Sequence, residues 1–259
     1  QEMVAAYKGP HQIKLRRNQV NQGLIEHVNL VLGLAAADFI VLAAGDDVSE
    51  PNRSAVIAQE FLQNPACQLL HSSVREMDEQ GNLQGLGHPP AHMHKLDLEK
   101  FAKSQSIYNG ATGAIRKNLF TFFGPITENE TYEDLTLGFR AALLDGIKFV
   151  DEPLVRYRTD IGLMSQFKRS SESRRERRKS YLRLAIATYQ QRKLDLSKVS
   201  HENQEQIGRV LLHEFETSKL RMRFHSNLFQ FFASSFTVGI VPFWKALRSE
   251  LRFSFRLID

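Results

Sequence analysis

The sequence predicts an α/β protein in which helices cover a sheet, followed by a helical C-terminal segment. Helical and extended apolar patterns alternate between residues 24 and 150, as they do in layered α/β structures. Residues 39–44 form a short, unbroken apolar run, which is typical of a strand buried on both faces in a parallel sheet. The 259 residues suffice for a large apolar core, and the single cysteine, Cys67, excludes an intramolecular disulfide.

The individual elements follow from apolar spacing and from the residues that start or stop a helix or strand. Residues 12–15 indicate a short strand, and residues 24–34 carry apolar side chains at helical spacing. Glu50-Pro51 indicates that a helix begins after the strand at 39–44. Further along, the patterns predict strands at 66–71, 111–115 and 147–150, helices at 96–103 and 135–144, and a loop from 77 to 93.

The composition is that of a globular protein, but its charge is unevenly distributed. With 42% hydrophobic and 24% charged residues, the chain is neither collagen-like, disordered nor a polytopic membrane protein. Residues 1–165 hold 15 Lys and Arg against 20 Asp and Glu, whereas residues 166–259 hold 19 against 9. We therefore expect two parts with different roles, an acidic first part and a basic second part.

The basic second part combines helical patterns at 182–189 and 207–224 with a mostly apolar stretch of 17 residues at 228–244. This stretch is at the short limit for a membrane span and has Lys and Arg on both sides. Two interpretations stay open: a segment that lies on an anionic membrane leaflet, or a helix packed on the preceding domain. Nucleic-acid binding is disfavoured, because the aromatic residues cluster with aliphatic ones and not among the basic residues.

Two acidic pairs lie at the ends of predicted elements. Asp46 and Asp47 follow the strand at 39–44, and in open α/β sheets ligands bind at the carboxyl ends of strands. Such oxygen ligands suit Mg²⁺ or Mn²⁺ bound to a diphosphate, although an ordinary turn explains the pair equally well. Glu133 and Asp134 begin a helix, where a carboxylate is stabilised and can act as a general base. Thr131 with Asp134 is nearly a capping box, which explains this pair without a function.

Several motifs follow one another in a fixed order. The first are Asn21-x-Gly23, Asn29, residues 37–47 and Glu50-Pro51. The later ones are Asn109-Gly110-Ala111-Thr112-Gly113-Ala114, Arg116-Lys117, Phe123-Gly124-Pro125, Glu133-Asp134-Leu135 and Leu154-Val155-x-Tyr157-Arg158. Together they resemble the family 2 glycosyltransferases of the GT-A fold, over residues 10–165. The resemblance implies a Rossmann-like mixed sheet flanked by helices, with residues 1–165 as the glycosyltransferase domain and residues 166–259 as a basic helical, membrane-associated segment.

The resemblance also implies a reaction and a set of site residues. The enzyme would transfer a sugar, with inversion, from a nucleotide-diphosphate sugar to a hydroxyl of a glycan or lipid-linked acceptor, as in cell-surface polysaccharide synthesis. Asp46, Asp47 and Asp160 would bind Mg²⁺ or Mn²⁺, and Asn21 and Gly23, together with Asp46 and Asp47, would bind the nucleotide sugar. Asp134 would be the catalytic base, with Glu133 beside it. Such an enzyme is expected in the cytoplasm, peripheral at the inner face of a membrane.

The sequence departs from the family pattern at three places. Ala44 stands where relatives have the first Asp of an Asp-x-Asp element, and Asp160 stands where many have a His. The family's first strand and its nucleotide-binding segment do not precede residue 1, so we expect an N-terminally truncated domain that binds a nucleotide sugar poorly. Ala44 and Asp160 keep open the alternative of a catalytically silent GT-A-like binding module.

Overall fold

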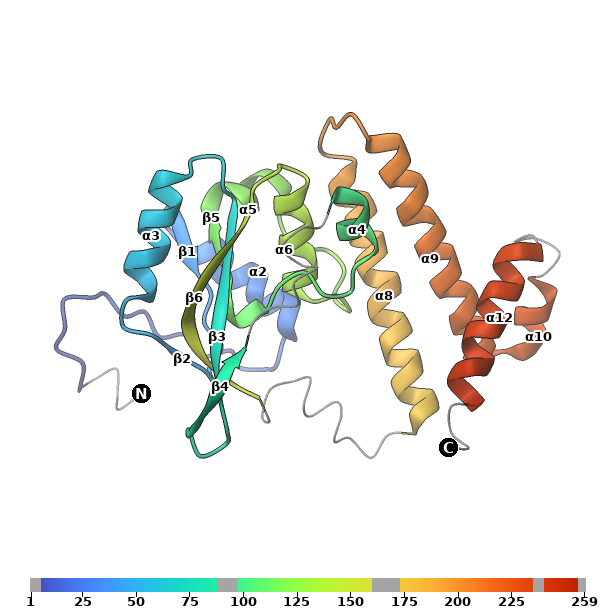
Figure 1. Ribbon diagram of the computed structural model, residues 1–259, viewed down its shortest axis with the longest axis horizontal. Helices are drawn as coiled ribbons and strands as arrows, with labels where there is room; N and C mark the ends of the chain where they lie inside the picture. The colour runs from blue at the N-terminus through green and yellow to red at the C-terminus, as the bar shows by residue number, and fades with distance from the viewer. Residues whose placement is uncertain (1–5, 88–96, 160–172, 235–239, 256–259) are drawn as a thin grey trace.

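The computed structural model describes residues 6–87, 97–159, 173–234 and 240–255. It shows a mixed sheet with helices packed on it and a helical extension at the C-terminal end (Figure 1). The strands are β1 (Phe39–Val41), β2 (Val48–Ser49), β3 (Leu69–Met77), β4 (Leu83–Gly87), β5 (Ala114–Arg116) and β6 (Ile147–Arg158). The sheet order is β1-β5-β3-β6-β2, with β4 paired to β3. Only the β3–β6 pair is parallel among these described strands.

The helices that belong to the first part of the chain cover both faces of this sheet. They are α2 (Leu24–Leu34), α3 (Arg53–Gln63), α4 (Leu98–Lys103), the 3₁₀ helix η2 (Gly110–Thr112), α5 (Lys117–Phe123) and α6 (Glu133–Ala142). Successive side chains of a strand point to opposite faces. Leu69 accordingly joins a core with α5 and α6, while Leu70 joins a second core with Ile57 and Phe61 of α3. The predicted α/β class with a mixed sheet flanked by helices is confirmed.

Three local expectations are wrong. Residues 12–15 are exposed and not in a strand. The strand β1 is not part of a parallel arrangement, because within the described residues it pairs with β5 alone, and antiparallel. The expected loop at 77–93 contains β4, which returns along β3 after a turn in which the Asp78 carboxylate accepts a hydrogen bond from the backbone N of Asn82 at 2.8 Å. The glycine-rich sequence of β4 carries little apolar signal, so its pairing could not be recognised.

The basic second part is helical and shares the core of the sheet domain. It consists of α8 (Arg174–Leu196), α9 (Gln204–Ser226), α10 (Leu228–Ala233) and α12 (Ile240–Phe255). One hydrophobic cluster contains Phe139 of α6, Tyr189 of α8 and Leu211 of α9. A buried ion pair between Arg140 of α6 and Asp195 of α8, with Nε–Oδ2 at 2.9 Å, crosses the same interface. The two parts are therefore joined by packing, whatever their separate roles.

The apolar stretch at 228–244 does not form one helix. Its described part lies mainly in α10 and at the beginning of α12, and both helices pack against α9 (Figure 1). Phe231 and Phe243 are buried and stack with ring centroids 4.8 Å apart, while Phe229 is 82% exposed. Among the described residues, no helix has the length and apolar character that a membrane span requires. Packing on α9 thus accounts for the buried side chains in the described part of this stretch, whereas others, such as Phe229, face solvent.

Candidate active site

The Asp46–Asp47 turn follows β1 and is held by Arg158 at the end of β6. The backbone N of Arg158 donates to Oδ1 of Asp47 at 2.8 Å, and its Nε donates to the carbonyl oxygen of Asp46 at 3.0 Å. The same guanidinium binds the carbonyl oxygens of Asp78 and Glu79 at 2.8 and 2.7 Å. Burial raises the pKa of the half-buried Asp47 carboxyl and the charge of Asp46 adds to this, although the Arg158 hydrogen bond opposes it. The turn is therefore held by two hydrogen bonds from Arg158 and carries negative charge that is incompletely solvated.

Arg53 connects this turn to η2. Its side chain is almost fully buried, and one terminal nitrogen donates to the carbonyl oxygens of Leu42 and Ala111 at 2.7 and 2.9 Å. The other terminal nitrogen donates to the Ser49 hydroxyl at 3.0 Å. Burial lowers the pKa of Arg53, whereas the charge of Asp47 raises it, which places this cation within reach of the acidic turn. Arg53 thus fixes the backbone on both sides of the site.

The second acidic pair begins α6 and lies against η2. A Cβ on Gly110 would be 2.8 Å from Oε1 of Glu133 and 3.5 Å from Cβ of Asp134, so only glycine permits this approach without a shift. The near capping box does not form, because the N-cap is Tyr132 and the Thr131 hydroxyl instead contacts the Thr188 hydroxyl at 2.9 Å. Helix capping by Thr131 therefore does not account for the two carboxylates at this position.

The protein environment opposes the ionisation of Asp134. Burial, followed by the charge of Glu133, raises the pKa of Asp134 to about 7. The hydrogen bond from the backbone N of Leu135 to Oδ1, at 2.7 Å, and the positive charge of Arg192 act in the opposite direction. Burial likewise raises the pKa of Glu133. A carboxyl with a pKa near neutral pH can accept a proton and release it again, as general base catalysis requires.

Two buried side chains surround Asp134. Tyr108 is 2% exposed, and its hydroxyl has no hydrogen-bond partner among the described residues. Burial raises its pKa strongly, with further contributions from the charges of Asp134 and Glu133. Arg192 extends from α8, and its terminal nitrogens donate to the carbonyl oxygens of Ala102, Ser104 and Leu135 at 3.0, 2.8 and 3.2 Å. Burial lowers the pKa of Arg192 to about 10, so at neutral pH it remains a cation close to Asp134.

Tyr157 of β6 lies between the two acidic pairs. Burial raises the pKa of its phenol, and the charges of Asp47, Asp46 and Asp134 each raise it further. Because electrostatic interactions weaken with distance, both acidic pairs must lie near the Tyr157 hydroxyl to raise its pKa. Asp46–Asp47 and Glu133–Asp134 therefore both lie within electrostatic reach of Tyr157, and Glu133–Asp134 also lies against η2.

The other predicted site residues are placed differently. The Asn21 side chain accepts a hydrogen bond from the backbone N of Gly23 at 2.9 Å, which forms an exposed turn before α2. Among the described residues, no hydrogen bond joins this turn to either acidic pair. Asp160 lies outside the described residues. Asn29 has a packing role, because its side chain exchanges two hydrogen bonds of 2.8 Å with the backbone of Ile126.

Sequence reasoning missed Arg53, Tyr108 and Arg192. A signal for Arg53 existed, since it is spaced four and eight residues from Ile57 and Phe61 and so shares the buried face of their helix. Arg192 has no local signal, because its proximity to Asp134 depends on the packing of α8 against α6. A buried cation in a basic helix resembles its exposed neighbours in sequence.

Comparisons with known proteins give weak likenesses. No protein-family model and no curated protein matches the sequence. Among solved structures, the chain is similar to the mannosyltransferase PcManGT from Pyrobaculum calidifontis in complex with GDP-Man and Mn²⁺, with 12% identity and a TM-score of 0.48 over 93% of this chain and 62% of that one. It is also similar to TarS 1–349 of S. aureus, with 13% identity and a TM-score of 0.41 over 78% of this chain and 72% of that one. The chain thus spans less than two thirds of the mannosyltransferase, and likenesses of this strength do not define its activity.

Proposed function

We propose that the chain belongs to an inverting, family 2-like glycosyltransferase that transfers a hexose or deoxyhexose from a nucleotide-diphosphate sugar to a hydroxyl of a glycan or lipid-linked acceptor. The observation that carries this proposal is the meeting of the two acidic pairs at Tyr157 and η2. The order of the sequence motifs supports it independently. Asp46–Asp47 is suited to binding the diphosphate of the donor through a metal ion, and Glu133–Asp134 provides a carboxyl, that of Asp134, with a pKa near neutrality.

The proposed reaction is a single displacement. The acceptor hydroxyl gives its proton to a carboxylate oxygen of Asp134 as its own oxygen forms a bond to the anomeric carbon of the sugar. The bond between that carbon and the diphosphate oxygen breaks at the same time, and the electron pair leaves with the nucleotide diphosphate. Attack from the face opposite the leaving group inverts the anomeric configuration. The charge of Arg192 favours the ionised form of Asp134 before the acceptor binds.

Asp46 and Asp47 suit a divalent cation, because the Asp47 carboxyl is half-buried and the negative charge of Asp46 acts on it. Mg²⁺ is often held by one or two carboxylates and by the phosphates of the substrate. Among the described residues, no cluster of three or more His, Cys, Asp or Glu side chains is placed to hold a metal alone. We therefore propose that Asp46 and Asp47 supply two ligands, the diphosphate supplies others, and Asp160 is a third protein ligand. Bound there, Mg²⁺ or Mn²⁺ would offset negative charge on the leaving diphosphate.

The test is transfer by the intact protein from a panel of nucleotide-diphosphate sugars, with Mg²⁺ or Mn²⁺ and after chelation. We expect Asp134→Asn to reduce transfer by about 10²–10⁴-fold, the usual contribution of a general base. Asp145→Asn is the matched control, because Asp145 is exposed beyond the other end of α6. Transfer by Asp134→Asn at the rate of the parent would show that another group is the base.

Ala44 favours a second candidate function, a binding module that keeps the scaffold without turnover. It is exposed. It stands where the glycosyltransferases that the sequence resembles have a carboxylate. Such a module would bind a nucleotide sugar, with or without metal, and release it unchanged. Donor binding measured by calorimetry, without sugar transfer or donor hydrolysis, would support this function over the enzyme.

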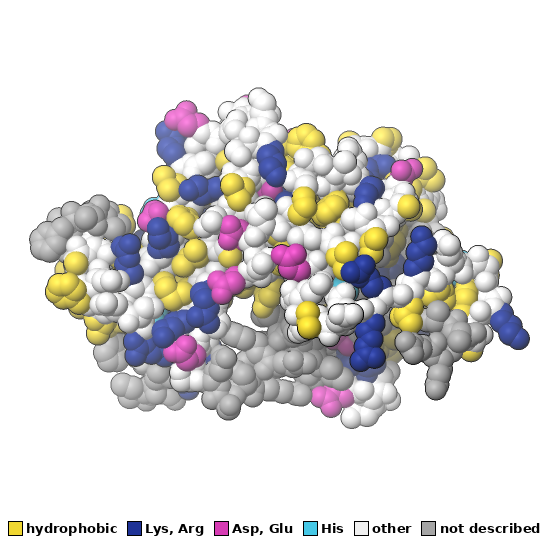
Figure 2. Space-filling model, turned by 180° about the vertical axis from the view of Figure 1, so that it is seen from behind, with side chains coloured by type: hydrophobic (Ala, Val, Ile, Leu, Met, Phe, Trp, Pro, Cys, Tyr) yellow, Lys and Arg dark blue, Asp and Glu magenta, His cyan; other side chains and the backbone are white. Residues whose placement is uncertain are grey.

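We also propose peripheral contact of the C-terminal helices with an anionic membrane. The solvent-facing side of α12 carries Trp244, Lys245, Arg248, Leu251 and Arg252, which mix apolar and basic side chains without an acidic one. This composition suits a helix lying in the interface of an anionic leaflet. Figure 2 shows Lys and Arg side chains beside hydrophobic ones at this end of the molecule, on the left of the view.

Flotation of the intact protein with anionic vesicles tests this contact. Trp244→Ser combined with Lys245→Ser should reduce the floating fraction. The matched control is Leu194→Ser combined with Arg209→Ser, which alters exposed side chains of α8 and α9. Equal flotation of both variants and the parent would exclude this face as the contact.

A further inference from the structure

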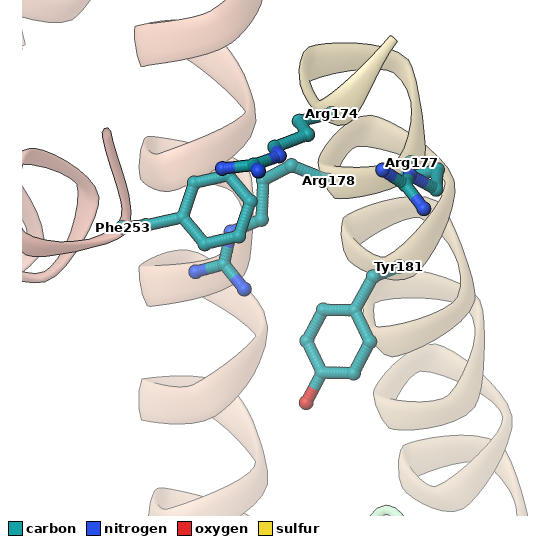
Figure 3. A pocket seen from close by; sticks show the side chains of 5 residues that line it. All are labelled: Arg174, Arg177, Arg178, Tyr181 and Phe253. Carbon is teal, nitrogen blue, oxygen red and sulfur yellow. The ribbon is translucent and has the colours of Figure 1, made fainter. Parts of the chain in front are cut away.

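A pocket of about 340 Å³ lies between the beginning of α8 and the end of α12. It is lined by Arg174, Arg177, Arg178, Tyr181 and Phe253. Figure 3 shows Arg174 and Arg178 extending from α8 toward Phe253, with Tyr181 further along α8. Its volume is within the range of small-ligand sites. Tyr181, the lining residue nearest along α8 to Arg192, is 11 residues before it, so roughly 16 Å of helix separates the pocket from the candidate active site.

The acidic groups around this pocket are already paired with cations. Glu176 contacts Lys179, with Oε1 and Nζ 2.9 Å apart. Glu250 is fully buried and contacts Arg178, as well as Arg221 at 3.6 Å and His225 at 2.7 Å. Burial acts to raise the pKa of Glu250, but hydrogen bonds from Arg178 and His225 bring it below its usual value. Glu250 therefore stays ionised and balances only part of the positive charge.

Two arginines of the pocket have no such counter-charge. Among the described residues, neither Arg174 nor Arg177 forms an ion pair or a side-chain hydrogen bond. Both are at the solvent-accessible start of α8, so their guanidinium groups are available to a ligand. The next arginine, Arg175, is already engaged, because its Nε donates to the carbonyl oxygen of His225 at 2.8 Å. The five residues that line the pocket thus include three arginines and no carboxylate.

Arg178 is held in place while part of it faces the pocket. Its Nε donates to Oε2 of Glu250 at 2.9 Å, and one terminal nitrogen donates to Oε1. A guanidinium has five N–H donors, so its other terminal nitrogen can still bind a ligand. The carbon at its centre lies 4.9 Å from the ring centroid of Phe253 and 5.4 Å from that of Tyr181. The two rings and Glu250 fix this guanidinium, which lowers the entropic cost of binding.

We propose that this pocket binds the phosphate group of a phosphorylated ligand whose neighbouring apolar part packs against Tyr181 and Phe253. Phosphate offers several acceptor oxygens to converging guanidinium groups, which bind it in a bidentate manner. The aromatic rings would be poor neighbours for a fully hydrated inorganic anion alone. A lipid head group combines both features, and a soluble organic phosphate combines them to a smaller extent.

The experiment compares the intact protein with the variant Arg174→Ala/Arg177→Ala. Its matched control, Arg17→Ala/Arg209→Ala, removes the same charge from exposed positions before α2 and on α9. Each protein is titrated with glycerol phosphate in one arm. In the other arm it is sedimented with phosphatidylcholine vesicles that contain or lack phosphatidylglycerol. Thermal unfolding of each variant shows that it is folded, which we expect because neither Arg174 nor Arg177 is buried.

The parent and the control should bind equally, and the pocket variant should bind at least about tenfold more weakly in one or both arms. If the pocket variant loses binding to vesicles alone, the phosphate belongs to a lipid. If it loses binding to glycerol phosphate alone, the phosphate belongs to a soluble ligand. Equal binding by the pocket variant and the control in both arms, or no binding by the parent in either, overturns the proposal.

Discussion

Replacing Asp134 by Asn removes a carboxyl whose ionisation the fold opposes. Burial, followed by the charge of Glu133, raises the pKa of Asp134 from 3.8 to about 7. The folded protein therefore holds this proton more tightly than the unfolded chain does, and unfolding free energy is lost as the pH rises through this interval. Below the interval both states are protonated and the carboxyl has no effect. Above a pH of about 7, the full loss of unfolding free energy is present.

The size of this cost follows from the two pKa values. The interval from 3.8 to about 7 corresponds to ~4 kcal/mol at about 1.4 kcal/mol per pKa unit. Asp134 keeps part of its surface in contact with water, and we therefore expect about half of this, ~2 kcal/mol, as the gain of Asp134→Asn above neutral pH. The Asn side chain has nearly the same shape, and its Oδ1 can still accept the hydrogen bond from the backbone N of Leu135.

Urea unfolding at about pH 5 and about pH 8 measures the effect without any knowledge of the sugar donor. The stability advantage of Asp134→Asn over the parent should widen by ~1–2 kcal/mol between these two conditions. Asp145→Asn is the control, because Asp145 is exposed and its positive φ of 50° suits Asn equally well. An equal advantage at both pH values, or a variant less stable than the parent at the higher one, would refute this account of Asp134.

Three further results are expected. Gly138→Ala in α6 places a methyl group 2.6 Å from Cγ2 and 3.1 Å from Cβ of the fully buried Ile107, so urea unfolding should show a loss of ~1–3 kcal/mol. Gly85→Ala, with no heavy atom within 4 Å of the added methyl group, should cost less than about 1 kcal/mol. Arg140→Leu should lower the unfolding free energy by ~3–5 kcal/mol, because it leaves the charge of the buried Asp195 without its ion-pair partner. Adding Asp195→Leu should recover part of that loss, and no recovery would show that the charge of Asp195 is not its cause. Cys67 is buried, and burial raises the pKa of its thiol, so alkylation of Cys67 should follow the rate of unfolding. Alkylation of Cys67 in the folded protein as fast as that of cysteine in a free peptide would contradict its burial.

Local patterns were sufficient to predict most helices of the fold. The helices at 24–34 and 135–144 were expected close to where α2 and α6 lie, because their apolar spacing depends only on neighbouring residues. Strand pairing could not be predicted in this way. The antiparallel partner of β1 is β5, more than seventy residues later, and the apolar run at 39–44 is compatible with either direction.

The sequence by itself determined that two acidic pairs exist, that each follows or begins a regular element, and that the second part of the chain is basic. Only the tertiary structure decided that the pairs border one site, because their approach depends on the contacts of Arg53 and Gly110 with segments far along the chain. It also decided which cations are buried. Arg192 lies beside Asp134, while Arg174 and Arg177 remain at a pocket without carboxylate partners among the described residues. The sequence shows which side chains are charged. Their burial and their ion-pair partners, which set their pKa values and reactivity, depend on tertiary packing.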